Sequence, residues 1–389
     1  MDKAAKNAID CLRRAARKAM AEQIAVAEIP SPSWKAGSRG EHLIGRFADL
    51  GVKAHSDAVG NVVAVIEGTR RDSYPAAILS AHMDSVFYDI KDIKVERKGS
   101  RYYAPGICDN AVGVATLIMI AGALRECGAK TPGDVVLVGS VGEEGEGRLR
   151  GMRHFWKDCP YHDPWFISID GSGASVAHKA LASWSPTIVV KGPGGHSYSN
   201  HGRPNPVHML SRFVARLTDT LEADAETNTV FSATVMQGGT ALNVIPSEVR
   251  LVLNLRSADT ARLDQMVRTT RRLLRDARRE ELDRATGEGD LQVRHRAVAR
   301  PGGHTSTDHP LVQTAFSAYR AEGLAVKEPV ISTDANMPMS LGVPAINVGA
   351  GGRAANVHSV HEWYENSNRG SALAAIGRMV FQTTGWKDG

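Results

Sequence analysis

The sequence lacks any apolar run long enough to cross a membrane. A membrane-spanning helix needs about 20 apolar residues, whereas the longest run here covers only residues 111–124. Residues 1–23 are charged and helix-like, without the apolar core that a signal peptide needs. We therefore expect a cytoplasmic protein with no membrane partner, in which residues 111–124 form a buried helix.

Paired cysteines and a strong net charge are also missing. The four cysteines, Cys11, Cys108, Cys127 and Cys159, form no CxxC motif, which favours free thiols in a reducing compartment. The net charge of +5, from 47 basic and 42 acidic residues, is too mild to indicate a nucleic-acid partner. The arginines within residues 268–283 are interleaved with acidic residues and lack aromatic neighbours, so they indicate a solvated helix face.

Apolar strand-like runs and a helical pattern alternate between residues 61 and 170. The strands are expected at 61–66, 76–81, 134–141 and 165–170, with a helix at 110–124 between them. Continuous apolar strands separated by helices predict an α/β fold with a mostly parallel sheet and helices on both faces. In such a sheet, ligands bind beyond the carboxyl ends of the strands.

The pattern changes between residues 183 and 300, where it indicates a ferredoxin-like α+β domain of order β-α-β-β-α-β. Residues 249, 251, 253 and 255 are apolar and alternate with mostly polar residues, which indicates a sheet with one covered face. We predict a catalytic domain of residues 1–182 and 301–389, interrupted by a lid or dimerisation domain at 183–300. The expected elements are strand 187–191, helix 204–222, strands 229–236 and 248–256, helix 260–283 and strand 291–298, and then helix 310–322, strand 345–348 and helix 371–383.

Acid and imidazole side chains stand at or just beyond the ends of the apolar runs. His82 follows residues 76–80, Glu143 and Glu144 follow residues 135–142, and Asp170 closes residues 165–169. Such side chains rarely recur in this position unless something positive binds there. Together with Asp109 and His358, they predict a site for two divalent metal ions.

Carboxylate and imidazole groups are suitable ligands for such ions, and a catalytic site leaves a position open for water. One of the two glutamates completes a set of five ligands with His82, Asp109, Asp170 and His358. If one carboxylate bridges the ions, each ion has three protein ligands, and Asp109 suits the bridge because it stands at the start of the apolar helix. Asp84 follows His82 by two residues and is expected to orient the imidazole through its carboxylate.

Each motif has a simpler explanation when it is taken alone. A His-x-Asp motif is common by chance, and a pair of adjacent glutamates usually lies on a solvated face. The occurrence of all these residues in order, each at a strand end, favours the metal site. Two imidazoles in an oxygen-rich ligand set fit zinc, manganese or cobalt, and zinc is the first expectation.

The chain resembles the co-catalytic metallopeptidases, a family that includes peptidase T, the carnosinases, glutamate carboxypeptidase, aminoacylase and succinyl-diaminopimelate desuccinylase. The resemblance runs nearly from end to end and includes the domain insertion. The matching motifs are DAVGNVV (57–63), AHMDS (81–85), GICDNAVG (106–113), GEEG (142–145), IDG (169–171), GPGGHS (192–197), NVIP (243–246) and VHSVHE (357–362).

Carried over residue by residue, the resemblance implies that His82 and Asp170 bind one metal ion. It places Glu144 and His358 on the other ion, with Asp109 as the bridge. Glu143 becomes the general base, which takes a proton from water and passes it to the leaving nitrogen.

The resemblance also bears on the choice of the last ligand. His361 competes with His358, but the family has a glutamate four residues after this ligand, which fits His358 and Glu362. The step from Asp109 to Asn110 matches a position where the family usually has a cis peptide bond.

The inserted domain carries further residues that match the family. His196 alone indicates a solvated loop, but the resemblance implies that it reaches the active site of a partner subunit and stabilises the oxyanion. Asn243 and Arg256 would bind substrate, and the planar guanidinium of Arg256 suits a carboxylate. The loop 349–352, with Gly351, is expected to offer backbone N–H groups to an anionic end of the substrate. The resemblance thus implies a homodimer or higher homo-oligomer formed through the inserted domain.

These patterns together predict a metal-dependent hydrolase that cleaves a C–N bond of a small substrate. A di- or tripeptide exopeptidase in the style of peptidase T is the first expectation, to which the segment STDAN (332–336) also points. An N-acyl amino acid deacylase and a hydrolytic deaminase of an aromatic amine are alternatives, because one scaffold can serve several activities. A non-catalytic metal-dependent binding protein would lack a ligand or the base, and none is missing. The sequence has no G-x-S-x-G motif, which argues against a serine hydrolase.

Overall fold

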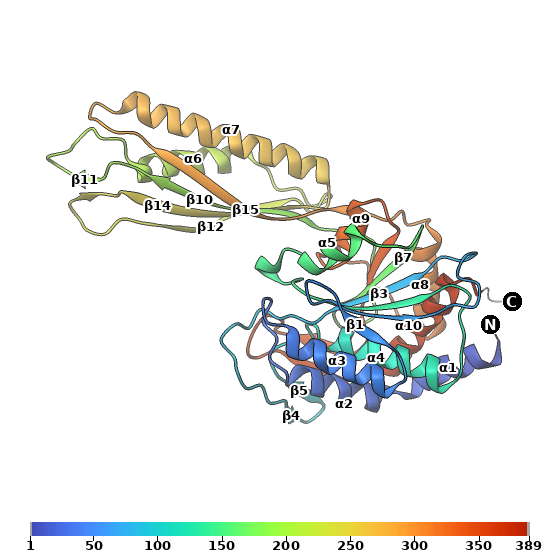
Figure 1. Cartoon of the computed structure of the whole chain (residues 1–389). Helices are drawn as coiled ribbons and strands as arrows, with labels where there is room; N and C mark the ends of the chain where they lie inside the picture. Colours follow the sequence, from blue (N-terminus) through green and yellow to red (C-terminus); the bar gives the residue numbers. More distant parts are fainter. Residues whose placement is uncertain (1, 387–389) are drawn as a thin grey trace. The chain divides into compact units, whose positions relative to one another are not determined.

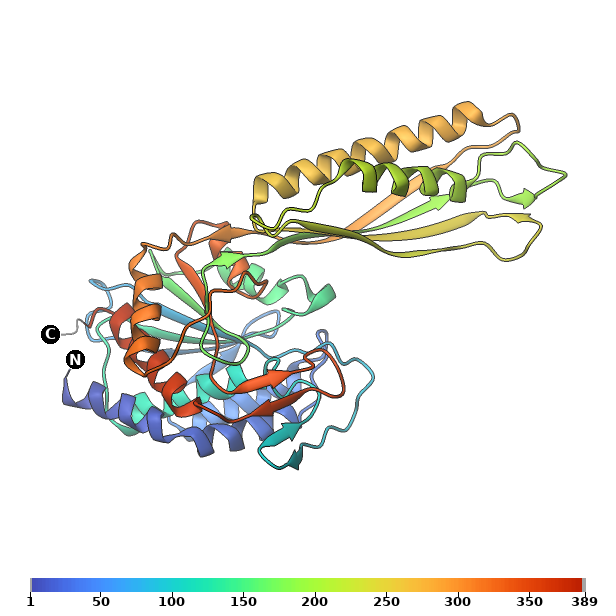
Figure 2. The same ribbon diagram turned by 180° about the vertical axis from the view of Figure 1, so that it is seen from behind.

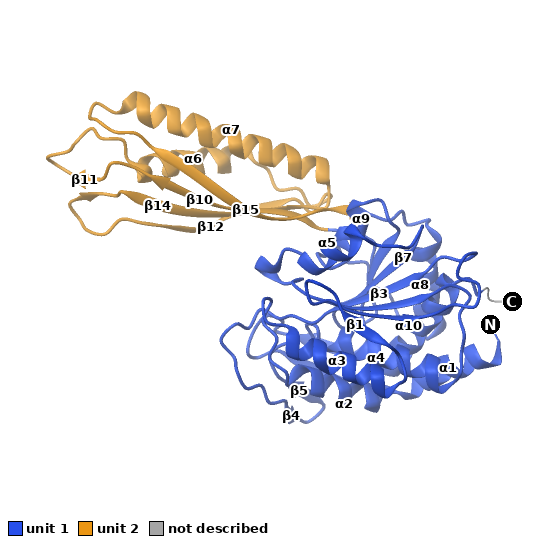
Figure 3. Ribbon diagram, in the orientation of Figure 1, with its two compact units in different colours: residues 1–180, 304–389 blue, residues 181–303 orange. Residues whose placement is uncertain are grey.

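The computed structural model describes residues 2–386, which form two compact units (Figure 3). Unit 1 comprises residues 1–180 and 304–389, and unit 2 comprises residues 181–303. The boundaries predicted from the sequence, 183 and 300, differ from these by two and three residues. Each unit has its own buried apolar core.

Unit 1 is built on a seven-stranded sheet of order β1-β2-β6-β3-β7-β17-β8 (Figure 1). The central strands β6, β3, β7 and β17 pair in parallel, whereas β1, β2 and β8 pair antiparallel at the edges. The predicted α/β class is confirmed, with a parallel centre and antiparallel edges. The strands are β1 (Ala54–Ser56), β2 (Val62–Ile66), β3 (Ala77–His82), β6 (Val135–Ser140), β7 (Trp165–Ile169), β8 (Val176–Ala177) and β17 (Ala345–Val348).

Helices cover both faces of this sheet. Side chains of β3 alternate between two apolar clusters: Leu79 packs with the cluster that includes α1–α4, α8 and α10, and Ile78 packs with the cluster that includes α5 and α9. Residues 111–124 are all buried in α4, as predicted. The helices are α1 (Lys3–Arg14), α2 (Ala16–Ala27), α3 (Gly37–Asp49), α4 (Ala111–Glu126), α5 (Arg150–Lys157), α8 (Pro310–Ala321), α9 (Asn336–Ser340) and α10 (Arg369–Thr383), with a 3-10 turn at Gly145–Gly147.

Short strands complete unit 1. A four-stranded sheet of order β18-β19-β5-β4 has no counterpart in the sequence prediction. β9 and β16 lie where the chain passes between the units. The short strands are β4 (Glu96–Lys98), β5 (Arg101–Tyr103), β9 (Lys179–Ala180), β16 (Gly303–His304), β18 (Arg353–Ala355) and β19 (Trp363–Glu365).

Unit 2 has the predicted order β-α-β-β-α-β in an antiparallel sheet of strand order β12-β14-β10-β15. Figures 1 and 2 both show α6 and α7 on one face of this sheet. The predicted alternation in β14 is confirmed, because Val249, Leu251, Leu253 and Leu255 are all buried. The elements are β10 (Ala182–Lys191), β11 (Gly195–His196), α6 (Pro206–Thr220), β12 (Val230–Gly238), β13 (Val244–Ile245), β14 (Glu248–Ser257), α7 (Thr260–Arg284) and β15 (Gln292–Arg300). Among the helices within residues 2–386, none is long and apolar enough to cross a bilayer.

Candidate metal centre

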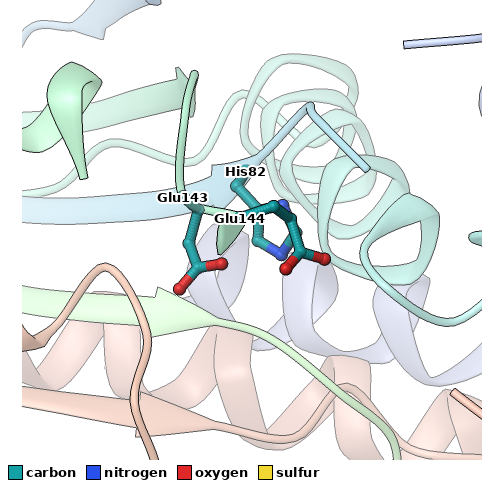
Figure 4. A group of neighbouring side chains, drawn as sticks. All are labelled: His82, Glu143 and Glu144. Carbon is teal, nitrogen blue, oxygen red and sulfur yellow. The ribbon is translucent and has the colours of Figure 1, made fainter. Parts of the chain in front are cut away.

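The parallel centre of the unit 1 sheet brings its polar strand ends together. His82 is the last residue of β3, Glu143 and Glu144 follow β6, and Asp170 follows β7. Figure 4 shows His82, Glu143 and Glu144 as neighbours, with the two glutamate carboxylates pointing in different directions. One ligand atom from each of these three residues lies within 4.8 Å of the others. This edge of the sheet therefore concentrates acidic and imidazole groups in one buried place.

Asp109 lies between the two histidines and faces each of them with a different oxygen atom. Its Oδ1 is 3.0 Å from Nε2 of His82, and its Oδ2 is 2.9 Å from Nε2 of His358. Asp170 lies on the His82 side, with 3.7 Å between Oδ2 and Nε2, and Glu144 lies on the His358 side, with 3.1 Å between Oε1 and Nε2. The result is two ligand groups that share one carboxylate, each of which fits a divalent cation.

The hydrogen bonds of His82 provide a direct test of this fit. Its Nδ1 lies 3.0 Å from the backbone carbonyl of Asp84. A carbonyl oxygen only accepts, so Nδ1 carries a proton. Burial opposes a second proton, but the Asp109 and Asp170 carboxylates raise the pKa of His82 well above its usual value, and without that second proton Nε2 presents a lone pair. That lone pair faces carboxylate oxygens, and Nε2 has no hydrogen-bond partner of good geometry among residues 2–386. A cation between these atoms removes the conflict, so the residues present fit a bound metal ion.

The buried carboxylates of the cluster also need positive charge close to them. Burial and the Asp109 carboxylate raise the pKa of Glu144 to about 7. Hydrogen bonds to Asp109 and Glu144 raise the pKa of His358 to about 10. Burial also raises the pKa of Asp170 well above its usual range. In the metal-free protein, protons therefore occupy the place of cations.

Asp84 acts differently from the sequence expectation. Its carboxylate oxygen Oδ1 lies 3.7 Å from Nδ1 of His82, and the imidazole is held by the Asp84 backbone carbonyl instead. The two carboxylate oxygens accept the backbone N–H groups of Glu143 and Glu144, at 3.0 and 3.1 Å. Asp84 is fully buried. Its side chain therefore fixes the peptide that carries both glutamates, and the prediction that it orients the imidazole is wrong.

Two further residues shape the loop around Asp109. The buried Glu362 accepts N–H groups from residues 106, 108 and 109, at 2.7 to 3.0 Å. The peptide bond between Asp109 and Asn110 is cis, as the resemblance implied. The Asn110 side chain caps α4 by accepting the N–H of Gly113 and donates to the carbonyl of Ile169. Sequence reasoning missed this role of Asn110, although an asparagine directly before an apolar helix is a familiar N-cap signal.

His358, rather than His361, contacts the Asp109 and Glu144 carboxylates. The His361 backbone accepts a hydrogen bond from the Asn356 side chain and donates one to the Ser359 hydroxyl. This agrees with the choice of His358 that the family spacing favoured.

In unit 2, His196 lies on β11 and Asn243 directly precedes β13, the strand that pairs with β11. Nδ1 of His196 accepts the backbone N–H groups of Tyr198 and Ser199, at 3.2 and 3.3 Å. A neutral ring therefore carries its proton on Nε2, 3.5 Å from Nδ2 of Asn243, and this contact is a hydrogen bond only with the Asn243 amide turned to present its oxygen. The structure thus presents the exposed His196 as an Nε2–H donor.

Arg256 lies elsewhere in unit 2. It stands at one end of β14, where it pairs in register with Ser183, whereas Glu248 at the other end pairs with Lys191. The chain continues from Lys191 into the turn that carries His196. Glu248 and Arg256 are eight residues apart on β14, which is about 26 Å at about 3.3 Å per residue. One copy of unit 2 therefore does not bring Arg256 together with His196 and Asn243.

The loop 349–352 departs from the sequence expectation. All four of its backbone N–H groups already donate within the chain, to the carbonyls of residues 175, 171, 173 and 367 in turn. These groups are not available for an anionic ligand. The expectation that these N–H groups are free to bind an anion is therefore wrong, while Gly351 as a substrate-binding residue stays a prediction.

Comparisons with known proteins identify the family of the chain. A family pattern described as Peptidase family M20/M25/M40 matches residues 78–382, which is most of the chain. The chain therefore belongs to this peptidase family.

Among curated relatives, the succinyl-diaminopimelate desuccinylase of Nitrosospira multiformis is 30% identical over 187 residues, which cover 44% of this chain and 48% of the relative. The corresponding enzyme of Legionella pneumophila (strain Lens) is 26% identical over 217 residues, covering 50% of this chain and 56% of the relative. The chain thus matches about half the length of these relatives.

Solved structures match over nearly the whole chain. A tripeptidase of Staphylococcus aureus aligns with a TM-score of 0.80 and 19% identity, covering 95% of this chain and 98% of that one. An aminopeptidase of Bacillus cereus aligns with a TM-score of 0.78 and 18% identity, with the same coverage. A dinuclear metal-binding peptidase of Bacillus subtilis aligns with a TM-score of 0.68 and 14% identity, covering 95% and 99%. At these identities the likeness establishes the fold.

Proposed function

We propose that this protein is a dinuclear metallopeptidase that hydrolyses a peptide bond of a small substrate. The observation that carries this proposal is the position of Asp109, whose two carboxylate oxygens each face one imidazole. His82 and Asp170 would hold one divalent ion, Glu144 and His358 the other, and Asp109 would bridge them. Zinc is the first candidate, and manganese or cobalt suit the same ligands.

Glu143 is the proposed general base. When bound, the two cations lower the pKa of water and polarise the scissile carbonyl. Glu143 takes a proton from the attacking water and then donates it to the leaving nitrogen. The Asp84 carboxylate supports this role, because it fixes the N–H groups of both Glu143 and Glu144 while their side chains point in different directions.

A di- or tripeptide is the proposed substrate, cleaved by exopeptidase action. The likeness in fold to a tripeptidase and to an aminopeptidase along nearly the whole chain supports it. The second candidate is an N-acyl amino acid, because the curated sequence relatives are desuccinylases that remove an acyl group from an amine. Both reactions break an amide C–N bond with the same chemical groups.

His196 and Asn243 would stabilise the oxyanion and bind the substrate from a partner subunit, and Arg256 would bind a substrate carboxylate from a different copy of unit 2. The length of β14 supports this division, because a di- or tripeptide is too short to reach both ends of the strand. The Nε2–H of His196 is a donor suited to a developing oxyanion. The active unit would therefore be a homodimer or higher oligomer.

The edge strand β12 supports such pairing through unit 2. It lies at the edge of its sheet, and it leaves Val230, Val235 and Met236 substantially exposed. An exposed apolar edge strand is a ready template for pairing with a second strand. A second copy of β12 would cover these side chains and complete the strand's backbone hydrogen bonds.

A substrate panel tests the proposed function. The zinc-, manganese- and cobalt-loaded protein is assayed against tripeptides, dipeptides, N-acetyl and N-succinyl amino acids, and aminobenzoate amides, with a chelator-treated sample as control. The proposal expects metal-dependent release of an N-terminal amino acid from a peptide. Activity confined to N-acyl substrates would select the deacylase instead, and chelator-resistant activity would contradict both.

A further inference from the structure

Asp334 is a buried carboxylate in unit 1 that no step above uses. It precedes α9 and is only 2% exposed. Its Oδ2 accepts hydrogen bonds from the hydroxyl groups of Ser80 and Ser140, both at 2.5 Å. Its Oδ1 is also buried and has no hydrogen-bond partner among residues 2–386. Burying a carboxylate in this way costs free energy, and burial accordingly raises the pKa of Asp334 to about 6.

The two serines stand on the strands that carry the metal centre. Ser80 lies two residues before His82 on β3, so both side chains point to the same face of the sheet. Ser140 is the register partner of His82 on the neighbouring strand β6, and it lies three residues before Glu143. Both serines are fully buried. A single oxygen atom of Asp334 therefore joins the ends of β3 and β6, close to the positions of His82 and Glu143.

Asp334 is itself held in place. The Thr333 N–H donates to Oδ1 of Asn336 at 2.8 Å, and the Ala335 N–H donates to Oγ1 of Thr333 at 3.3 Å. On the same face of the sheet, Ala335 and Met339 pack against Ile78 in the apolar cluster that includes α5 and α9. The turn before α9 is therefore fixed by local hydrogen bonds and by packing. Its Asp334 carboxylate binds both strands from this fixed position.

A second carboxylate ties the same two strands. Asp84, two residues after β3, accepts the N–H groups of Glu143 and Glu144, which lie three and four residues after β6. Asp84 thus restrains the loop after β6, while Asp334 restrains the strands themselves. Catalytic groups need to be held within about 0.5 Å of their productive geometry by such supporting contacts.

We propose that Asp334 is a positioning residue that sets the placement of Glu143 relative to His82 by binding Ser80 and Ser140 together. The proposal rests on the assignment of Glu143 as the base. Without the carboxylate, two buried hydroxyl groups lose their acceptor, and the ends of β3 and β6 lose the side-chain contact that adds to their backbone pairing. Because reaction rates depend steeply on alignment, a shift of about 1 Å costs up to about a hundredfold in rate.

The test compares Asp334→Ala, Asp334→Asn, Ser80→Ala and Ser140→Ala with the wild type, all loaded with cobalt. Measured quantities are kcat and KM on the best peptide of the substrate panel, the ligand-field absorption spectrum of bound Co²⁺, and the thermal midpoint. We expect kcat to fall by about ten- to a hundredfold in Asp334→Ala, with KM nearly unchanged. Asp334→Asn, which keeps one acceptor oxygen, should retain more activity. Each serine variant should lose a smaller factor, and the Co²⁺ spectrum should change in parallel with kcat.

Asp134→Asn is the matched control. Asp134 is also buried, lies directly before β6 at its opposite end, and accepts the Gly68 N–H at 2.8 Å and Nη2 of Arg71 at 2.9 Å. Its loss should lower the thermal midpoint while kcat and the Co²⁺ spectrum stay unchanged. Should Asp334→Ala fail to fold, the two single serine variants decide the question, because each removes only one hydroxyl group.

The proposal is overturned if the Asp334 and serine variants lose only stability, as the Asp134 control does, and keep wild-type kcat and spectrum. A failure of the underlying assignment looks different, since Glu143→Gln would then remain active whatever the Asp334 variants do.

Discussion

The candidate residues of the two units differ in how firmly the chain holds them. In unit 1, His82 and Glu143 are 2% and 4% exposed, and the surrounding carboxylates and backbone groups fix their positions. In unit 2, His196 is exposed, its neighbour Val244 is 38% exposed, and Leu242 is fully exposed. Unit 1 therefore contains a complete set of groups for cation binding within one chain. The unit 2 groups are exposed, which is consistent with the proposal that they bind the substrate of a partner subunit.

The largest expected effect is that of replacing Glu143, the proposed base of unit 1, while the metal ligands stay in place. Glu143→Gln should lower kcat by about 10²- to 10⁴-fold, because the amide cannot take a proton from water. The metal content should stay at the wild-type value, measured by elemental analysis on the same sample. A variant with near-normal rates would show that Glu143 is not the base.

The next prediction tests the contribution of unit 2. His196→Ala should lower kcat by about 10²- to 10³-fold through the loss of an oxyanion donor. Its metal content should not change, because none of the proposed ligands lies in unit 2. A loss of bound metal in this variant would contradict the separation of roles between the units.

Co-expression of two differently tagged variants tests whether His196 acts in a partner subunit. A mixed dimer of Glu143→Gln and His196→Ala contains one site with both groups intact if His196 acts in trans. Random pairing makes half of the dimers mixed, so about a quarter of wild-type activity should return. If His196 serves its own chain, each chain lacks one group and no activity returns.

The dependence of metal affinity on pH should follow the pKa values of the metal-free centre. Glu144 and His358, with pKa values raised to about 7 and about 10, both hold a proton at pH 6, and a cation displaces both. Affinity should therefore rise with pH, by roughly tenfold per pH unit for each proton displaced. The slope should fall above pH 7, where Glu144 has already lost its proton. Competition titrations with a chelator from pH 6 to pH 8 measure the metal affinity at each pH. Glu144→Gln should abolish the change in slope.

The smallest expected effect concerns the exposed edge strand of unit 2. Val235→Lys places a charge in the middle of β12, which should shift the dimer towards monomer in sedimentation experiments without changing metal content. Arg250→Lys on the neighbouring strand β14 is the control, because it keeps the charge at an exposed position. An unchanged oligomeric state in Val235→Lys would exclude β12 as the interface.

Much of the fold could be predicted because its signals are local. Continuous apolar runs marked the central strands, and the alternation from Val249 to Leu255 marked a strand with one covered face. The parallel order of β6, β3 and β7 then brings His82, Glu143 and Asp170 to one edge, which follows from topology alone.

The contacts that support the site could not be predicted, because they join residues far apart in the sequence. Asp334 binds Ser80 and Ser140, which lie 254 and 194 residues earlier in the sequence, and no local sequence pattern connects them. The Asp84 carboxylate binds backbone N–H groups, which every residue has, so its partners depend on the tertiary structure. The glycine-rich loop 349–352 looked free for the same reason, since the carbonyls that occupy its N–H groups come from other segments.

The central claim is that Asp109 joins two cation sites within unit 1. Elemental analysis of the purified protein after saturation with zinc and removal of excess metal tests it most directly, with Asp109→Ala beside the wild type. The account predicts two zinc ions per wild-type chain and the loss of at least one in Asp109→Ala, together with loss of peptide hydrolysis. An unchanged zinc content in Asp109→Ala, or a wild-type chain that retains no zinc, would contradict it.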